Sequence, residues 1–110
     1  MVAEAVHNDP VLAEMVRRLV GALAPDRIYL FGSRARGGAG ADSDYDLMVV
    51  VPRSDLPGYK RAQEAYRVLY GVGAAKDVIV LTRAEFDRKK TVACSLAATV
   101  LREGSELYAA

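Results

Sequence analysis

The sequence predicts an α/β (α+β) fold in which helices flank a small mixed β-sheet. Segments 27–31, 45–51 and 77–81 are apolar and rich in strand-forming residues. Apolar residues recur at helical spacing in the segments between and around these strands. Because 110 residues with a hydrophobic content of 52% suit one compact core, we expect a single domain that spans residues 1–110.

The N-terminal half should contain a helix followed by two strands. Asp9 and Pro10 predict the start of the helix, because aspartate is a preferred N-cap and proline suits the first helical position. Pro25 ends this helix, and the strand 27–31 follows it. The segment 45–51 is nearly all apolar toward its end, which predicts a strand that is covered on both faces.

A second helix is predicted for residues 59–70, where apolar positions share one helical face. Three tyrosines lie near this face, and we expect them to pack against the protein rather than to stack on an adenine: Tyr59, Tyr66 and Tyr70. After the strand 77–81, the pair Thr82 and Glu85 matches a capping box and predicts another helix start.

The C-terminal segment predicts one more helix, over about residues 91–102, that ends at Gly104. Cys94 lies in an apolar stretch of it and is expected to be a small core residue rather than a nucleophile. A short strand can follow at residues 106–108. The basic run 88–90 is expected to be a solvated helix end.

Composition and charge exclude several classes of function. The formal net charge is +1, which gives no strong electrostatic case for DNA binding. Cys94 is the only cysteine and His7 the only histidine, so the chain cannot form an internal disulfide or a His/Cys zinc site. The N-terminus lacks the pattern of a secretory signal, and no apolar run is long enough for a membrane span. We therefore expect a cytoplasmic protein without a membrane partner.

Two carboxylates two positions apart, Asp44 and Asp46, come just where a buried strand begins. Residues i and i+2 of a strand face the same way, so these side chains should point together. Two like charges held close repel each other unless something neutralises them. A divalent cation such as Mg²⁺, which prefers hard oxygen ligands, would do so. A solvated turn that leads into the strand is the alternative explanation for the pair alone.

Two further features favour the metal-site interpretation. Gly32 and Ser33 follow a strand, and a glycine–serine turn lets backbone amides and a hydroxyl approach a phosphate. Asp77 opens the strand 77–81, and it would join the other carboxylates if that strand lay beside 45–51. Three carboxylates and a phosphate-binding turn are the parts of a two-metal phosphoryl or nucleotidyl transfer site.

The segment "GSRARGGAGADSDYD" resembles the motif of the minimal nucleotidyltransferases of the DNA polymerase beta superfamily. In this sequence Gly32-Ser33 is followed, after residues 34–43, by Asp44-Tyr45-Asp46, and a later apolar strand opens with Asp77. The resemblance covers roughly residues 28–81. It implies the polymerase beta-like nucleotidyltransferase fold and a magnesium-dependent transfer of a nucleotide.

Carried over residue by residue, the resemblance makes Asp44, Asp46 and Asp77 the catalytic residues and the ligands of two Mg²⁺ ions. It also implies that four residues bind the nucleotide triphosphate: Gly32, Ser33, Arg34 and Arg36. One of the two arginines could instead brace the turn. Ser43 is expected to cap or brace the acidic turn in a structural role.

The resemblance also implies a biological role. Small proteins of this type form toxin–antitoxin pairs in which the nucleotidyltransferase, as antitoxin, transfers AMP from ATP to a tyrosine of a HEPN-domain ribonuclease toxin. The alternative is a catalytically idle antitoxin, a binding module that neutralises its partner by contact only. A third option, transfer of a nucleotide to a small molecule such as an aminoglycoside, generally needs further helices for the acceptor.

Overall fold

The computed structural model describes residues 1–35 and 43–110, and its sheet has four strands in the order β3-β2-β1-β4. The strand bounds are β1 Arg27–Phe31, β2 Tyr45–Val51, β3 Lys76–Thr82 and β4 Ser105–Ala109. β1 runs antiparallel to both β2 and β4, whereas β2 and β3 are parallel. The predicted mixed α/β fold is therefore confirmed, and the strand that opens with Asp77 does lie beside the strand at 45–51.

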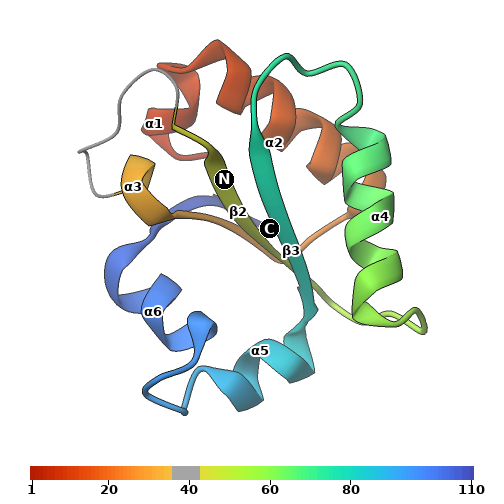
Figure 1. Cartoon of the computed structure of the whole chain (residues 1–110), viewed down its shortest axis with the longest axis vertical. Helices are drawn as coiled ribbons and strands as arrows, with labels where there is room; N and C mark the ends of the chain where they lie inside the picture. The colour runs from red at the N-terminus through yellow and green to blue at the C-terminus, as the bar shows by residue number, and fades with distance from the viewer. Residues whose placement is uncertain (36–42) are drawn as a thin grey trace.

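Helices cover the two faces of the sheet unequally, as Figure 1 shows. α1 (Glu4–His7), α2 (Pro10–Leu23) and α4 (Gly58–Val68) pack on one face. α5 (Arg83–Lys89) and α6 (Leu96–Glu103) pack on the other face. The short α3 (Gly32–Ala35) follows β1 directly. No helix in the described part of the chain has the length and apolar character that crossing a lipid bilayer requires.

The larger core lies between the sheet and the helices α1, α2 and α4. Helix α2 contributes Met15 and Leu19, which are fully buried, and α4 contributes Ala65, with Leu69 at its C-cap. The side chain of Asp9 caps α2 by accepting hydrogen bonds from the amides of residues 11 and 12, and Pro10 occupies the first turn. The predicted start of this helix is thus confirmed.

β2 is the central element of both cores. Leu47 and Val49 face the larger core, whereas Met48 and Val50 face a smaller one. In that smaller core Phe86 of α5 stacks on Tyr29 of β1 with ring centroids 5.7 Å apart. The strand is covered on both faces, as its apolar sequence predicts.

The second half of the chain corrects three expectations. The last helix begins only at Leu96 rather than near residue 91, because the Ser95 hydroxyl accepts from the amide of Ala98 and caps the helix there. Cys94 therefore precedes the helix and is exposed, not a core residue. The tyrosines of the α4 region are exposed as well, because Arg61, Ala65 and Leu69 form the inward face of that helix: Tyr59, Tyr66 and Tyr70.

Candidate active site

The sheet brings two of the predicted carboxylates to adjacent strands. Asp46 of β2 is the direct neighbour of Asp77 in the parallel pair β2–β3. On its other side Asp46 pairs with Phe31, the residue that precedes Gly32. Asp44 lies just before β2 and is exposed. The glycine–serine turn and these carboxylates therefore share one end of the sheet.

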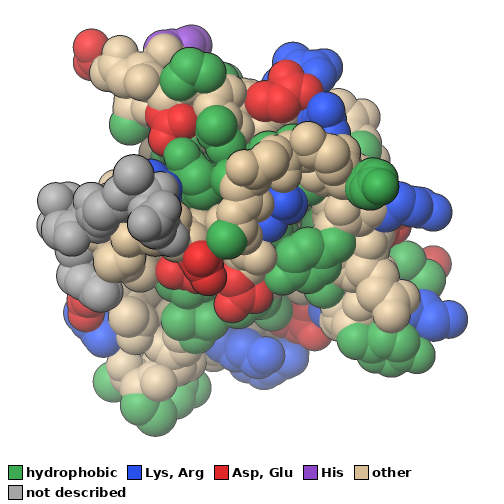
Figure 2. Space-filling model, turned by 45° about the horizontal axis from the view of Figure 1, so that its top comes forward, with side chains coloured by type: hydrophobic (Ala, Val, Ile, Leu, Met, Phe, Trp, Pro, Cys, Tyr) green, Lys and Arg blue, Asp and Glu red, His purple; other side chains and the backbone are tan. Residues whose placement is uncertain are grey.

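Strand alternation places Asp46 and Asp77 on the same face of the sheet. Asp46 alternates with Tyr45 and Leu47, which face the larger core, so it lies on the side of α5 and α6. Asp77 alternates with Val78, which also faces the larger core, and so lies on that same side. Figure 2 shows acidic side chains gathered near the middle of the face that it presents, with hydrophobic side chains around them.

Gly32 is adapted to the close approach of a carboxylate. Its φ is +74°, a backbone conformation that residues with a Cβ rarely adopt. A Cβ at this position would lie only 2.1 Å from the Oδ2 atom of Asp46. The absent side chain thus lets the Asp46 carboxylate lie against the backbone of the turn. Ser33 is the next residue, at the start of the short α3, and is half-buried.

Arg34 links the turn to the start of β2. Its Nε donates to the carbonyl oxygen of Ser43 over 2.8 Å, and its guanidinium lies 3.9 Å from the centre of the Tyr45 ring. The Tyr45 hydroxyl in turn donates to Oδ2 of Asp9 over 2.7 Å. Burial and the bond to Asp9 raise the pKa of Tyr45, while the charge of Arg34 opposes the rise. These contacts connect the N-cap of α2 to the residue beside Asp44.

Tyr66 holds the third carboxylate. Its hydroxyl donates to Oδ1 of Asp77 over 3.1 Å and accepts from the backbone amide of Val78 over 2.8 Å. Burial raises the pKa of Tyr66, as do the hydrogen bond and charge of Asp77, while the bond from Val78 lowers it. The hydroxyl therefore keeps its proton at neutral pH and acts as the donor toward Asp77. In the sequence, Tyr66 is marked only by its place on a helix face, and no spacing signal pairs it with Asp77.

The donor set at this end of the sheet consists of hard carboxylate oxygens, which suit Mg²⁺. In residues 1–35 and 43–110, no group of three or more His, Cys, Asp and Glu side chains has the geometry of a metal site. The pairing of Asp46 with Asp77, with Asp44 exposed just before β2, is nevertheless the donor chemistry that Mg²⁺ takes in proteins. Arg36, which sequence analysis placed at the nucleotide, lies outside the described residues.

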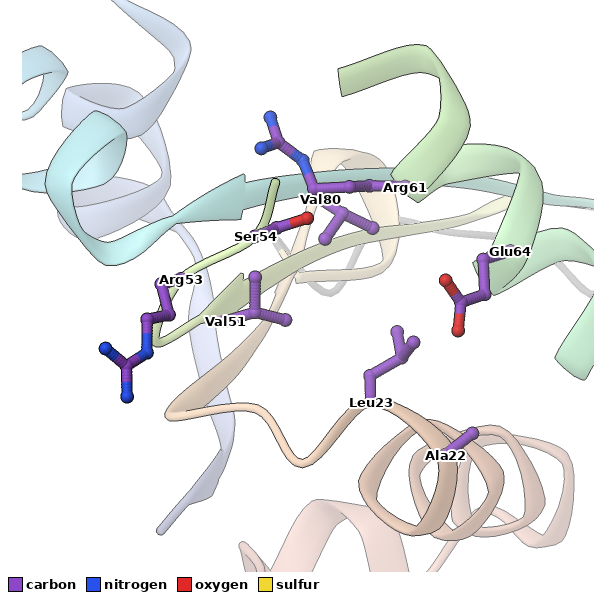
Figure 3. A pocket seen from close by; sticks show the side chains of 8 residues that line it. All are labelled: Ala22, Leu23, Val51, Arg53, Ser54, Arg61, Glu64 and Val80. Atoms are coloured by element: carbon purple, nitrogen blue, oxygen red, sulfur yellow. The ribbon is translucent and has the colours of Figure 1, made fainter. Parts of the chain in front are cut away.

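Two hollows lie near opposite ends of β2. One, of about 340 Å³, adjoins the acidic end and is lined by Val11, Arg34, Ser43, Tyr45 and residues 73–75. The other, of about 160 Å³, lies at the far end of β2 and β3, away from Asp46. Figure 3 shows Leu23, Val51 and Glu64 around this second hollow, with the Arg53 guanidinium pointing away from it. The first hollow touches Arg34 but none of Asp44, Asp46 and Asp77, and Tyr45 lines it from the face of the sheet opposite to Asp46.

The fold has counterparts among solved structures. A toxin–antitoxin complex crystallised with AMP-PNP is 22% identical with a TM-score of 0.57, over 89% of this chain and 73% of that one. A mutant form of the MntA-HpeT toxin–antitoxin complex is 19% identical with a TM-score of 0.51, over the same shares of both chains. At these identities the likeness concerns the fold alone.

A protein from Sulfolobus solfataricus assigned as a nucleotidyltransferase is 28% identical over 73% of this chain and 80% of its own, with a TM-score of 0.49. No curated protein sequence matches the chain significantly. The family model of the nucleotidyltransferase domain, in contrast, matches residues 11–101. This match includes the glycine–serine turn, both strands that carry the paired carboxylates, and most of the helices around them. The chain therefore belongs to the nucleotidyltransferase domain family.

Proposed function

We propose that this protein is a magnesium-dependent nucleotidyltransferase that transfers AMP from ATP to a protein acceptor and so acts as an antitoxin. The acceptor we propose is a tyrosine of a HEPN-domain ribonuclease toxin. The observation that carries the proposal is the pairing of Asp46 with Asp77 on adjacent strands, with the backbone of Gly32 against the Asp46 carboxylate. Membership of the nucleotidyltransferase domain family supports the reaction type.

We propose separate roles for the carboxylates and for the glycine–serine turn. Asp44, Asp46 and Asp77 would hold two Mg²⁺ ions. Asp46 lies between the glycine–serine turn that follows β1 and the neighbouring strand β3. Bound there, Mg²⁺ would neutralise charge on the triphosphate and on the leaving pyrophosphate. Gly32 and Ser33 would bind the β- and γ-phosphates through backbone amides and the Ser33 hydroxyl.

The chemical step is a displacement at the α-phosphorus. The acceptor hydroxyl oxygen forms a bond to this phosphorus, the bond to the bridging oxygen of the β-phosphate breaks, and pyrophosphate leaves. The proton of the hydroxyl passes to the Asp77 carboxylate. Arg34 would serve mainly as a brace, because its Nε donates to the Ser43 carbonyl and its guanidinium stacks on Tyr45. Arg36 is the arginine that we propose for the phosphates.

Two observations support the antitoxin role: the fold shared with toxin–antitoxin structures, and the resemblance of the motif to that of the minimal nucleotidyltransferases. Two of the structures that share the fold are toxin–antitoxin complexes, one of them crystallised with AMP-PNP. We therefore propose that the acceptor residue is presented by a partner protein, in a hetero-oligomer, and that both act in the cytoplasm.

The test is transfer of label from α-labelled ATP, with Mg²⁺, to the product of the neighbouring open reading frame. We expect label on one tyrosine of that partner, none when EDTA replaces Mg²⁺, and none with the double variant Asp44→Asn, Asp46→Asn. Circular dichroism would verify that the variant is folded. If the folded double variant protected cells from the toxin as well as the wild type, the antitoxin would act by contact only.

A further inference from the structure

We propose that Tyr66 is a positioning residue of the active site, which fixes the Asp77 carboxylate in the orientation that the transfer reaction needs. The inference rests on the proposed function, in which Asp77 binds a cation and takes the acceptor's proton. It assigns a role to a side chain of α4, a helix that contributes none of the predicted site residues.

Asp77 needs an external support because of its place in the fold. β3 is an edge strand, flanked by β2 on one side only, and Asp77 lies next to its first residue. Its side chain is exposed, so packing does not fix its rotamer. An aspartate in this setting would rotate among several orientations, and each would present its oxygens differently to a cation near Asp46.

Tyr66 supplies that support through two hydrogen bonds made by one oxygen atom. The hydroxyl donates to Oδ1 of Asp77 and accepts from the amide of Val78, so it ties the carboxylate to the backbone of its own strand. Oδ2 of Asp77 is then the oxygen that a cation would take. The backbone of Tyr66 is held in place in turn, because Ala65 of the same helix and Leu69 at its C-cap are fully buried in the larger core.

Tyr66 is less exposed than the other two tyrosines of this region. Tyr66 is 39% exposed, whereas Tyr59 is 64% and Tyr70 is 78% exposed. Tyr59→Phe and Tyr70→Phe therefore make matched controls, since each removes one hydroxyl from an exposed tyrosine in or next to α4. Tyr66→Phe retains the ring and removes only the oxygen that contacts Asp77 and Val78.

The experiment compares the three Tyr→Phe variants and Asp77→Asn with the wild type. Binding of Mn²⁺ is measured by electron paramagnetic resonance in the presence of a non-hydrolysable ATP analogue, and AMP transfer to the partner is measured at varied ATP. We expect Tyr66→Phe to weaken Mn²⁺ binding about fivefold, the effect of one hydrogen bond. We also expect kcat to fall by at least that factor while KM for ATP is unchanged, since Gly32 and Ser33 hold the triphosphate.

The two control variants should match the wild type in both measurements. A purely structural role of Tyr66 would lower the temperature of unfolding but leave Mn²⁺ affinity and kcat per folded molecule at wild-type values, and that result would overturn the inference. The proposed function is tested separately by Asp77→Asn. If Asp77→Asn abolishes transfer while Tyr66→Phe is fully active, the inference fails and the proposed function stands. If the wild type transfers nothing, the Mn²⁺ titration still decides whether Tyr66 orients Asp77.

Discussion

A single missing side chain, that of Gly32, allows the glycine–serine turn and the Asp46 carboxylate to approach each other. Gly32→Ala would require a Cβ at φ +74° and 2.1 Å from Oδ2 of Asp46. The backbone strain alone costs about 1–2 kcal/mol. We expect this loss in the free energy of unfolding, measured with urea, and a fall in AMP transfer of at least tenfold because the carboxylate must move.

Gly21 provides the control for this substitution. It lies within α2, and a Cβ there would meet no atom within 4 Å. Alanine has the higher helix propensity, so Gly21→Ala should raise the free energy of unfolding by up to about 1 kcal/mol and leave transfer unchanged. Wild-type activity of Gly32→Ala would show that the close contact at the turn does not matter to the reaction.

Some neighbours of the site residues follow from the sequence and others do not. Asp77 joins Asp46 only if their strands are neighbours, a condition that the sequence leaves open, and the parallel register shows that they are neighbours. The partnership of Tyr66 with Asp77 could not be anticipated, because helical spacing gives a face but does not say which face meets the sheet. The face defined by Ala65 and Leu69 is the buried one, and Tyr66 is left at its edge.

Among the elements, α5 depends on one glutamate that serves two partners. Oε1 of Glu85 accepts from the amide of Thr82, completing the capping box, and from the guanidinium of Arg61 over 2.8 Å. Arg61 is 7% exposed, so its charge is nearly removed from water. The amide of Thr82, followed by the charge of Arg61, lowers the pKa of Glu85 below its usual value, against the effect of burial.

Glu85→Gln should therefore destabilise the protein in a way that depends on pH. Glutamine can still cap the helix but cannot neutralise Arg61, so we expect a loss of about 1–3 kcal/mol in the free energy of unfolding at pH 7. Because the folded-state pKa of Glu85 is lowered, its stabilising effect is complete above the unfolded-state value of about 4.3. The effect is lost as pH falls through the lower folded-state pKa. Urea unfolding of both proteins from pH 7 to pH 3 should show their stabilities converging.

Glu14→Gln is the contrasting change for Glu85→Gln. Hydrogen bonds from Arg17 and Arg18 lower the pKa of Glu14 to about 2. The group is solvent-exposed, however, so water and salt screen these ion pairs and their loss should change stability little. A pH-independent difference between Glu85→Gln and the wild type would contradict the role given to the pair with Arg61.

Element boundaries differed in how far local sequence determined them. The capping box at Thr82 and the N-cap at Asp9 were predicted because each needs only side chains within one turn of the helix. The late start of α6 was not predicted, because residues 91–95 by themselves are compatible with a helix. The Ser95 hydroxyl, which caps α6, also donates to the carbonyl of Lys89 at the end of α5. That bond belongs to the connection between α5 and α6, which spacing alone does not reveal.

Over the whole molecule, the sheet separates a heavily packed face from the face that carries the carboxylates. The larger core lies under α1, α2 and α4, across the sheet from α5 and α6 (Figure 1). Strand alternation places Asp46 and Asp77 on the side of α5 and α6. β2 belongs to both layers, since its side chains alternate between the two cores. Apart from the contact of Tyr66 with Asp77 at the edge strand, this arrangement places stability mainly on one side and the proposed chemistry on the other, so substitutions away from that contact can affect the two properties separately.

Leu19→Ala tests this separation. Leu19 of α2 is fully buried in the larger core, and its truncation should lower the free energy of unfolding by about 2–5 kcal/mol. Because Leu19 lies across the sheet from Asp46, we expect transfer per folded molecule to remain at the wild-type rate at temperatures where the variant is folded. Leu101 of α6 is 47% exposed and provides the control, since Leu101→Ala should leave the free energy of unfolding nearly unchanged. If Leu19→Ala were folded but transferred AMP slowly, the loss of packing in the larger core would have displaced the carboxylates through β2. The two faces of the sheet would then not be separable.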